Sequence, residues 1–371
     1  MSAPTLSLAR IRGMRMRALL LTGERGHALG EGPGGVGRVV EHMGAMQAQD
    51  VASGRWSLGV RLPGLTAADV DAAIDSGEVL RTWPMRGTMH LVPPRDAAWM
   101  TALMSSRPRA AAAARRAGLG LTDSDVARGA EALRDALAGR RLTRSACLEA
   151  LDAAGIPPAG QRGYHVMVDA AQAGVVCVAG EQGKEQLFAL LDEWAPDPHR
   201  PTRDEGLGIL AARYVRSHGP VTERDLARWT GLPLRDCRAG IAVAGDAVTR
   251  VETEAGTMLV APDALAAEAV DLDDLALPGF DELVLGYGDR TAQLDKEHEA
   301  AVVPGGNGVF RSTFVLGGRV VGTWRRTLRA RSVSVEAHDI VGLGASERER
   351  CERALEPFGA FVGLPVTLGW A

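Results

Sequence analysis

Hydrophobic positions in the first third of the chain switch between the spacing typical of helices and that of strands. Thr66 followed by Asp69 indicates the start of a capped helix, and Gly77 marks its end. A glycine-rich turn at 30–35 separates the first two helical patterns. The elements predicted for this part are helices at 7–21, 36–46 and 66–77 and strands at 55–61, 79–83 and 88–92.

The same order, helices followed by a two-stranded hairpin, recurs twice farther along the chain. In residues 220–233 a threonine cap, a short amphipathic helix, a glycine turn and a proline before the next helix indicate a helix-turn-helix. Three helices plus a wing, three times over, predict three tandem winged helices. The elements expected in these two repeats are helices at 123–138, 143–154, 163–173 and 204–217 and strands at 175–179, 185–189, 248–251 and 257–260.

Beyond Pro278 the pattern changes to short strand-like segments separated by glycines. Two β-branched runs around Gly317-Gly318 give a strong hairpin signal. This part is therefore predicted to be a small β-rich, barrel-like domain with a closing helix. Its segments are strands at 282–285, 308–315, 319–324 and 332–336 and a helix at 346–355.

These patterns predict a mainly helical α+β protein whose chain is divided into four parts. Three of them are winged-helix domains, and the fourth is the barrel-like domain. A proline-rich connector at 194–201 separates the second part from the third. The expected boundaries are 1–118, 119–195, 202–262 and 275–371.

The composition is that of a globular protein of the cytoplasm. No apolar run is long enough to span a bilayer, and four widely spaced cysteines without a CxxC pair are typical of reduced core residues. The histidines and cysteines lack the spacing of zinc ligands, and neither a Walker loop nor a GxSxG motif is present. We therefore expect no metal, no cofactor and no membrane contact.

The charge distribution leaves two interpretations open. The net charge is −4, and all of the 42 basic residues are arginines except Lys184 and Lys296. Clustered arginines can line a groove for phosphates, because the guanidinium binds bidentately, or they can be solvated helix faces. The clusters lie at 10–25, 107–116, 140–144 and 319–331.

Gln47 and Gln49 are the strongest candidates for chemistry. In an extended or turning backbone, side chains two residues apart point to the same side, so both amides can face one small object while Ala48 turns into the protein. An amide cannot ionise, but it donates and accepts together and can fix a water molecule. The alternative is that both are solvated loop residues.

The segment Arg86-Gly87-Thr88-Met89-His90 adds a second candidate. Thr88 and His90 share one face of a predicted strand, so His90 either serves a site or is a partly buried histidine with satisfied ring nitrogens. The two lysines offer few amines for a Schiff base, which favours a reaction that uses water.

Taken together, these motifs resemble the AlkZ-type winged-helix DNA glycosylases over nearly the whole chain. The resemblance rests on four segments: Met46-Gln47-Ala48-Gln49, Arg86 to Val92, Pro304 to Arg311 and Gly322-Thr323-Trp324-Arg325-Arg326. The self-resistance branch of the family carries Gln-x-Gln, whereas the housekeeping branch usually ends the motif with Asp. Here Asp50 lies one place beyond Gln49 and is expected to face the other way.

The resemblance implies a C-shaped monomer that holds double-stranded DNA in a concave channel. Gln47 and Gln49 are then the catalytic residues of a monofunctional enzyme that removes bulky N7-alkylated guanine and unhooks interstrand crosslinks, as self-resistance to an alkylating antibiotic. Arg86, His90, Arg325 and Arg326 are the expected DNA contacts.

Two other classes of protein remain open on the sequence. One is a winged-helix regulator that reads an operator, although its candidate recognition helices at 163–173 and 233–243 carry few base-reading side chains. The other is an architectural or drug-sequestering protein without turnover.

Overall fold

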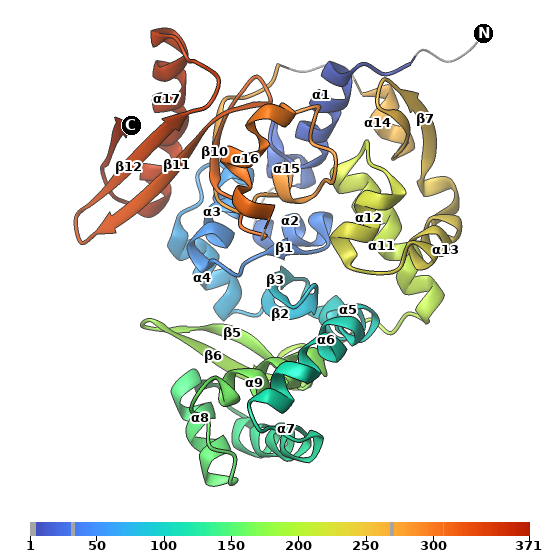
Figure 1. Ribbon diagram of the computed structural model, residues 1–371, viewed down its shortest axis with the longest axis vertical. Helices are drawn as coiled ribbons and strands as arrows, with labels where there is room; N and C mark the ends of the chain where they lie inside the picture. Colours follow the sequence, from blue (N-terminus) through green and yellow to red (C-terminus); the bar gives the residue numbers. More distant parts are fainter. Residues whose placement is uncertain (1–4, 31–33, 268–270, 307) are drawn as a thin grey trace.

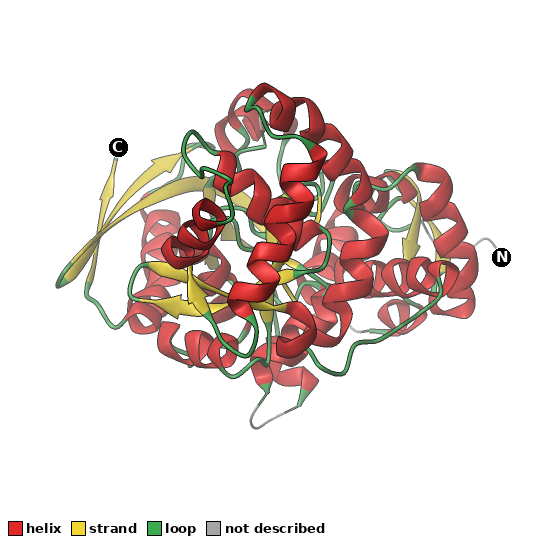
Figure 2. Cartoon of the chain, turned by 90° about the horizontal axis from the view of Figure 1, so that it is seen from below, coloured by secondary structure: helices red, strands yellow, loops and turns green. Residues whose placement is uncertain are grey.

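The computed structural model describes residues 5–30, 34–267, 271–306 and 308–371. Residues 31–33 of the predicted glycine-rich turn and Asn307 of the C-terminal motif lie outside them. Among the described residues, no helix is both long and apolar enough to cross a membrane. The fold is mixed α+β and mainly helical, as predicted (Figures 1 and 2).

The described helices are α1 (Leu8–Ala18), α2 (Gly35–Met43), α3 (Val51–Arg61), α4 (Ala67–Asp75), α5 (Pro94–Met104), α6 (Ser106–Gly118), α7 (Asp123–Leu137), α8 (Arg144–Ala153), α9 (Arg162–Gln172), α10 (Leu191–Trp194), α11 (Arg203–His218), α12 (Glu223–Thr230), α13 (Leu234–Ala244), α14 (Pro262–Ala266), α15 (Glu282–Leu285), α16 (Glu299–Val302) and α17 (Ala345–Val362).

The described strands are β1 (Met46–Gln47), β2 (Leu80–Met85), β3 (Thr88–Val92), β4 (Leu142–Thr143), β5 (Val176–Gln182), β6 (Glu185–Leu190), β7 (Thr249–Thr253), β8 (Gly256–Val260), β9 (Leu275–Leu277), β10 (Ser312–Leu316), β11 (Arg319–Arg329), β12 (Ser332–Asp339) and β13 (Val366–Trp370).

The first two hairpins join into one sheet. Its strand order is β1-β3-β2-β5-β6-β4, and the β2–β3 hairpin meets the β5–β6 hairpin where Arg81 pairs with Val178. Arg81 also donates to Glu181 at 3.1 Å, and Arg55 on α3 donates to the other oxygen of the same carboxylate at 2.8 Å. The sheet therefore fixes helices α7–α9, which have a hydrophobic core of their own, against the first part of the chain (Figure 1).

The third hairpin, β7–β8, is a separate two-stranded sheet beside α11–α13. The predicted caps of this part are present: Thr222 accepts from the Asp225 backbone N–H at 3.1 Å, and Gly231 ends α12 with φ +73°. The beginning of the chain also lies against this hairpin, because Leu6 forms a β-bridge with Thr253 of β7.

The barrel-like prediction is wrong as to closure. The C-terminal strands form an open sheet in the order β13-β12-β11-β10-β9, and its edge strands do not pair with each other in the described chain. β13 runs parallel to β12, and such a pair needs a crossover connection, here α17. This helix packs across the sheet against β9, β10 and β13.

Two segments predicted as strands are helical. Residues 55–61 lie in α3, because Asp50 caps that helix by accepting from the Ser53 N–H at 2.7 Å, and nearly every side chain of the segment is buried. Periodicity cannot distinguish strand from helix in a segment without an exposed side. Residues 282–285 form the single-turn helix α15, capped by Asp281.

α3 packs against the C-terminal helix through a glycine. Trp56 contacts Phe358 and Phe361 of α17 with ring centroids 5.2 and 5.1 Å apart. A Cβ on Gly59 would lie 2.6 Å from Cδ2 of Phe361 and 2.8 Å from Cε3 of Trp56. The close approach of the two helices therefore depends on the absence of a side chain there.

Gly59→Ala is expected to destabilise the protein by about 1–3 kcal/mol, because overpacking outweighs the gain in helix propensity. Urea unfolding checks it. Gly13→Ala is the matched control: Gly13 lies inside α1, a Cβ there meets nothing within 4 Å, and about 0.5–1 kcal/mol of stabilisation is expected. Equal unfolding midpoints for the two variants would contradict the packing argument.

Candidate active site

Strand β1 places Gln47 beside the β2–β3 hairpin. After α2 the chain turns at Gly44, which has φ +77°, and then pairs with β3, so that Gln47 lies opposite His90. The backbone N–H of Ala48 donates to the Met89 carbonyl at 2.9 Å. The Ala48 side chain is buried, as predicted.

Both glutamine side chains bind the β2–β3 hairpin through their oxygens. Oε1 of Gln47 accepts from Nη2 of Arg86 at 3.4 Å, and Oε1 of Gln49 accepts from the backbone N–H of Met89 at 3.0 Å. Gln47 is 8% exposed, whereas Gln49 is open to solvent. Both donors lack a lone pair, so the facing amide atoms must be oxygens. Within the described residues neither amide nitrogen donates a hydrogen bond.

Arg86 sits in the turn between β2 and β3. Its Nη1 donates to the Trp229 carbonyl at 2.6 Å, and its Nη2 lies 3.1 Å from Nε2 of His90. Burial lowers the pKa of the Arg86 guanidinium, and the charge of Glu282 acts in the opposite direction. The guanidinium is thus directed at the end of α12 and at Gln47.

His90 has no exposed surface. Its Nδ1 lies 2.8 Å from the Thr88 carbonyl, an acceptor, so Nδ1 carries the proton and Nε2 accepts from Arg86. Burial, followed by the charge of Arg86, lowers the pKa of His90 to about 3. The ring is therefore a neutral, satisfied core histidine. His90 and the Arg86 guanidinium bind other parts of the protein here, and that they contact DNA stays a prediction.

Asp50 is held away from the glutamine amides. Its Oδ1 caps α3 and also accepts from Nη2 of Arg326 at 3.1 Å. Arg326 therefore links the C-terminal sheet to the residue after Gln49. Arg325, its neighbour on β11, is exposed and donates to Glu336 at 2.5 Å.

The structure brings three of the six predicted residues directly together: Gln47, Arg86 and His90. Gln49 joins them through the hairpin backbone, and Arg326 through Asp50. Sequence reasoning missed Trp229, whose carbonyl anchors Arg86. No sequence signal marks it, because the contact is made by the backbone at the end of a helix 143 positions away.

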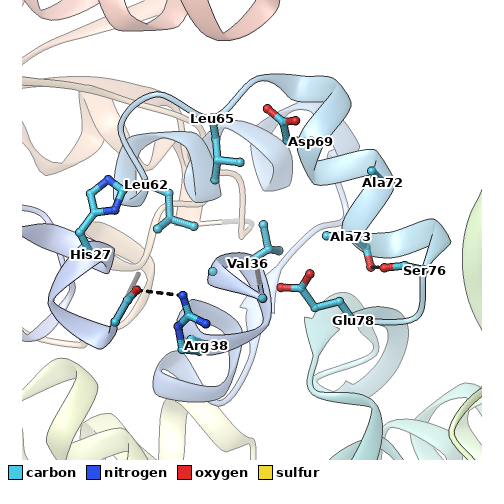
Figure 3. Close-up of a pocket in the computed structure, with 13 residues that line it drawn as sticks. His27, Val36, Arg38, Leu62, Leu65, Asp69, Ala72, Ala73, Ser76 and Glu78 are labelled. Atoms are coloured by element: carbon cyan, nitrogen blue, oxygen red, sulfur yellow. Dashed lines mark hydrogen bonds between the residues drawn. The ribbon is translucent and has the colours of Figure 1, made fainter. Parts of the chain in front are cut away.

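A cavity of about 710 Å³ lies elsewhere, at the start of α2 and along α4 (Figure 3). It is lined by aliphatic side chains such as Val36, Leu62 and Leu65 and by polar ones such as Asp69 and Glu78. Glu78 accepts from the Gly37 N–H at 2.5 Å. Neither glutamine lines it. In the described chain no three His, Cys, Asp or Glu side chains are placed to hold a metal ion.

Comparison with known proteins identifies the family. The model of a family described as DNA glycosylase AlkZ-like matches residues 40–361, which include both glutamines, the β2–β3 hairpin and most of the C-terminal part. An interstrand DNA cross-link repair glycosylase of Streptomyces sahachiroi is 27% identical over 300 residues, covering 77% of this chain and 81% of that protein.

The fold agrees as well. The structure of the Streptomyces sahachiroi DNA glycosylase AlkZ matches with a TM-score of 0.80 at 22% identity, over 99% of this chain and 100% of that one. The resemblance seen in the sequence motifs is confirmed, and it favours an enzyme over a regulator or a sequestering protein. The chain belongs to the AlkZ-like DNA glycosylases.

Proposed function

We propose that this glycosylase hydrolyses the N-glycosidic bond of bulky N7-alkylated guanine in double-stranded DNA, with Gln47 and Gln49 as its catalytic residues. Unhooking of interstrand crosslinks, and through it self-resistance to an alkylating antibiotic, belongs to the same proposal. The similarity to a glycosylase named for interstrand cross-link repair supports it. The enzyme would act as a monomer on the DNA of the cytoplasm.

One observation carries the proposal: neither His90 nor Asp50, beside the glutamine motif, is free to act as an acid. His90 is uncharged, and the Asp50 carboxylate caps α3 and pairs with Arg326. A site of this kind suits a leaving group that needs no acid. N7-alkylguanine is already a cation, so the C1′–N9 bond can break with both electrons going to the base, which leaves neutral.

The two amides would then bind and orient the deoxyribose and the attacking water. Each Oε1 uses one lone pair on the hairpin and keeps a second, which can accept a hydrogen bond from the attacking water, while the amide nitrogens can donate to deoxyribose or phosphate oxygens. The water oxygen bonds to C1′ and releases its proton to solvent, leaving an abasic site. Such positioning can supply several kcal/mol of the barrier reduction.

Replacing both glutamines, Gln47→Ala with Gln49→Ala, is expected to lower single-turnover excision of N7-methylguanine at least about 100-fold, because the water loses its orienting groups. Released base and alkali-labile sites are the readouts. Gln182→Ala, at the exposed end of β5, is the control for loss of a glutamine. Excision at the wild-type rate in the double variant would remove the catalytic assignment.

The same incubation tests turnover itself, with duplexes that carry N7-methylguanine or a defined crosslink. Stoichiometric binding without base release would indicate sequestration. Selective binding to an undamaged operator would indicate a regulator.

The excision rate is expected to be constant between pH 5.5 and pH 7. The amides do not titrate, and His90, with its pKa lowered to about 3, stays neutral throughout this range and charges only in stronger acid. A histidine base of ordinary pKa would instead lose about tenfold in rate over the lower part of the range. Single-turnover rates at saturating enzyme measure the profile, and a sigmoidal loss toward acid would point to a titrating base.

We propose further that Arg325 and Arg326 on β11 contact DNA phosphates beside the site. Neutralising both, Arg325→Gln with Arg326→Gln, should flatten the salt dependence of DNA binding by about 0.9 in log–log slope for each phosphate that the variant no longer neutralises. Arg128 and Arg134, exposed on α7 in ion pairs within that helix, provide the charge-matched control. An unchanged slope in the β11 variant would exclude phosphate binding by this pair.

A further inference from the structure

Arg86 occupies a backbone conformation that its side chain disfavours. Met85 pairs with Thr88, so the turn consists of Arg86 and Gly87, with φ +54° and +74°. Two-residue turns of this left-handed kind usually carry Asn, Asp or Gly, because a long side chain with φ above zero crowds its own backbone. A strained residue of this sort persists where its side chain has a role elsewhere.

The side chain of Arg86 is anchored at the end of α12. Nη1 donates to the Trp229 carbonyl at 2.6 Å, in the last turn of that helix, where unpaired carbonyls carry partial negative charge. Gly231, the left-handed end of α12, lies beside it: a Cβ there would be in ordinary van der Waals contact, 3.5 Å from Cγ of Arg86. The β2–β3 hairpin and helix α12 thus hold the guanidinium between them.

The other arm of the fork reaches the glutamine motif. Nη2 lies 3.1 Å from Nε2 of His90 and 3.4 Å from Oε1 of Gln47. The Thr88 carbonyl fixes the tautomer of His90, so that Nε2 is the acceptor. The neutral ring therefore positions the guanidinium without forming an ion pair with it. Since a guanidinium only donates, the Gln47 amide must turn its oxygen toward Arg86 and its nitrogen away.

We propose that Arg86 is a positioning residue for catalysis: anchored on Trp229 and His90, it fixes the orientation of the Gln47 amide. This inference rests on the proposed catalytic role of Gln47. It makes the end of α12 part of the support of the active site, because a shift of that helix moves Arg86 and with it the amide.

The orientation can be measured without substrate. The chain has glutamines at 47, 49, 161, 172, 182, 186 and 293, so selective ¹⁵N labelling of glutamine gives a spectrum with few side-chain amide signals. Arg86→Ala is expected to shift the Gln47 amide signals and to narrow the separation of its two protons, while the Gln293 signals stay in place. Arg107→Ala, which removes a neighbouring donor to the Gly231 carbonyl at 3.1 Å, should leave the Gln47 signals unchanged.

Kinetics then test the consequence. Single-turnover excision at saturating enzyme should fall about ten- to hundredfold in Arg86→Ala with little change in Kd for damaged duplex, since misplacing one catalytic group costs this much. Arg86→Lys should not restore the rate, because an ammonium keeps the charge but lacks the fork that joins three acceptors. Arg86→Gly relieves the backbone strain, so it should fold well and show the same loss.

Unmoved Gln47 signals in Arg86→Ala would overturn the inference even if excision were lost. Shifted signals with wild-type excision would overturn it too, because orientation would then not matter for the reaction. A wild-type enzyme that releases no base defeats the proposed function alone, and the amide spectrum still decides whether Arg86 orients Gln47.

Discussion

A buried ion pair between Arg61 and Asp281 joins the parts of the chain on which the site depends. Nη1 of Arg61 donates to Asp281 at 2.7 Å, and neither side chain is more than 1% exposed. Arg61 also donates to the Leu19 carbonyl at 2.9 Å, and Asp281 accepts from Ser57 at 3.0 Å while it caps α15. Burial acts to raise the pKa of Asp281, but the charge and hydrogen bonds of Arg61 prevail and lower it.

Such a pair stabilises only as a unit. Loss of one partner of a buried pair typically costs about 3–5 kcal/mol, because the other charge stays behind without compensation. Arg61 is the last residue of α3 and Asp50 caps its first turn, so this helix is fixed at both ends by charge. The glutamine motif lies directly before that cap. Its position is therefore set by packing between α3 and the C-terminal part, and not only by its short pairing with β3.

The local signals in the sequence predicted much of the fold. Thr66, Thr122, Thr202 and Thr222 each form a capping box, and those at 66 and 222 followed directly from Thr and Asp three residues apart. The wrong elements share a cause: α3 is buried almost all round and α15 is one turn long, so neither shows a helical period. The joined sheet depends on one pairing between residues 97 positions apart, which no local pattern encodes.

The candidate site divides in the same way. The inward turn of Ala48 followed from the alternation of side chains along an extended chain, whereas the catalytic role of Gln47 and Gln49 stays a prediction. Asp50 accepts hydrogen bonds from Ser53 and Arg326. What the sequence could not predict is which partners the arginine side chains bind. Arg86, which is predicted to contact DNA, donates to Trp229, His90 and Gln47, and Arg326 donates to Asp50. Except for the contact between Arg86 and His90, which lies within one hairpin, these contacts join residues far apart in the sequence and exist only once the hairpins have been placed.

This placement of charge bears on how undamaged DNA would be spared. In the proposed reaction neither His90 nor Asp50 acts as an acid toward the leaving base. The N–H of His90 is hydrogen-bonded to the Thr88 carbonyl, and the Asp50 carboxylate accepts hydrogen bonds from Ser53 and Arg326. An unmodified guanine would have to leave as an anion, which two amides cannot stabilise enough. Selection would then come from the positive charge of the lesion and not from the shape of a pocket. A crosslinked guanine carries the same charge as a simple N7 adduct, so selection by charge would treat both alike.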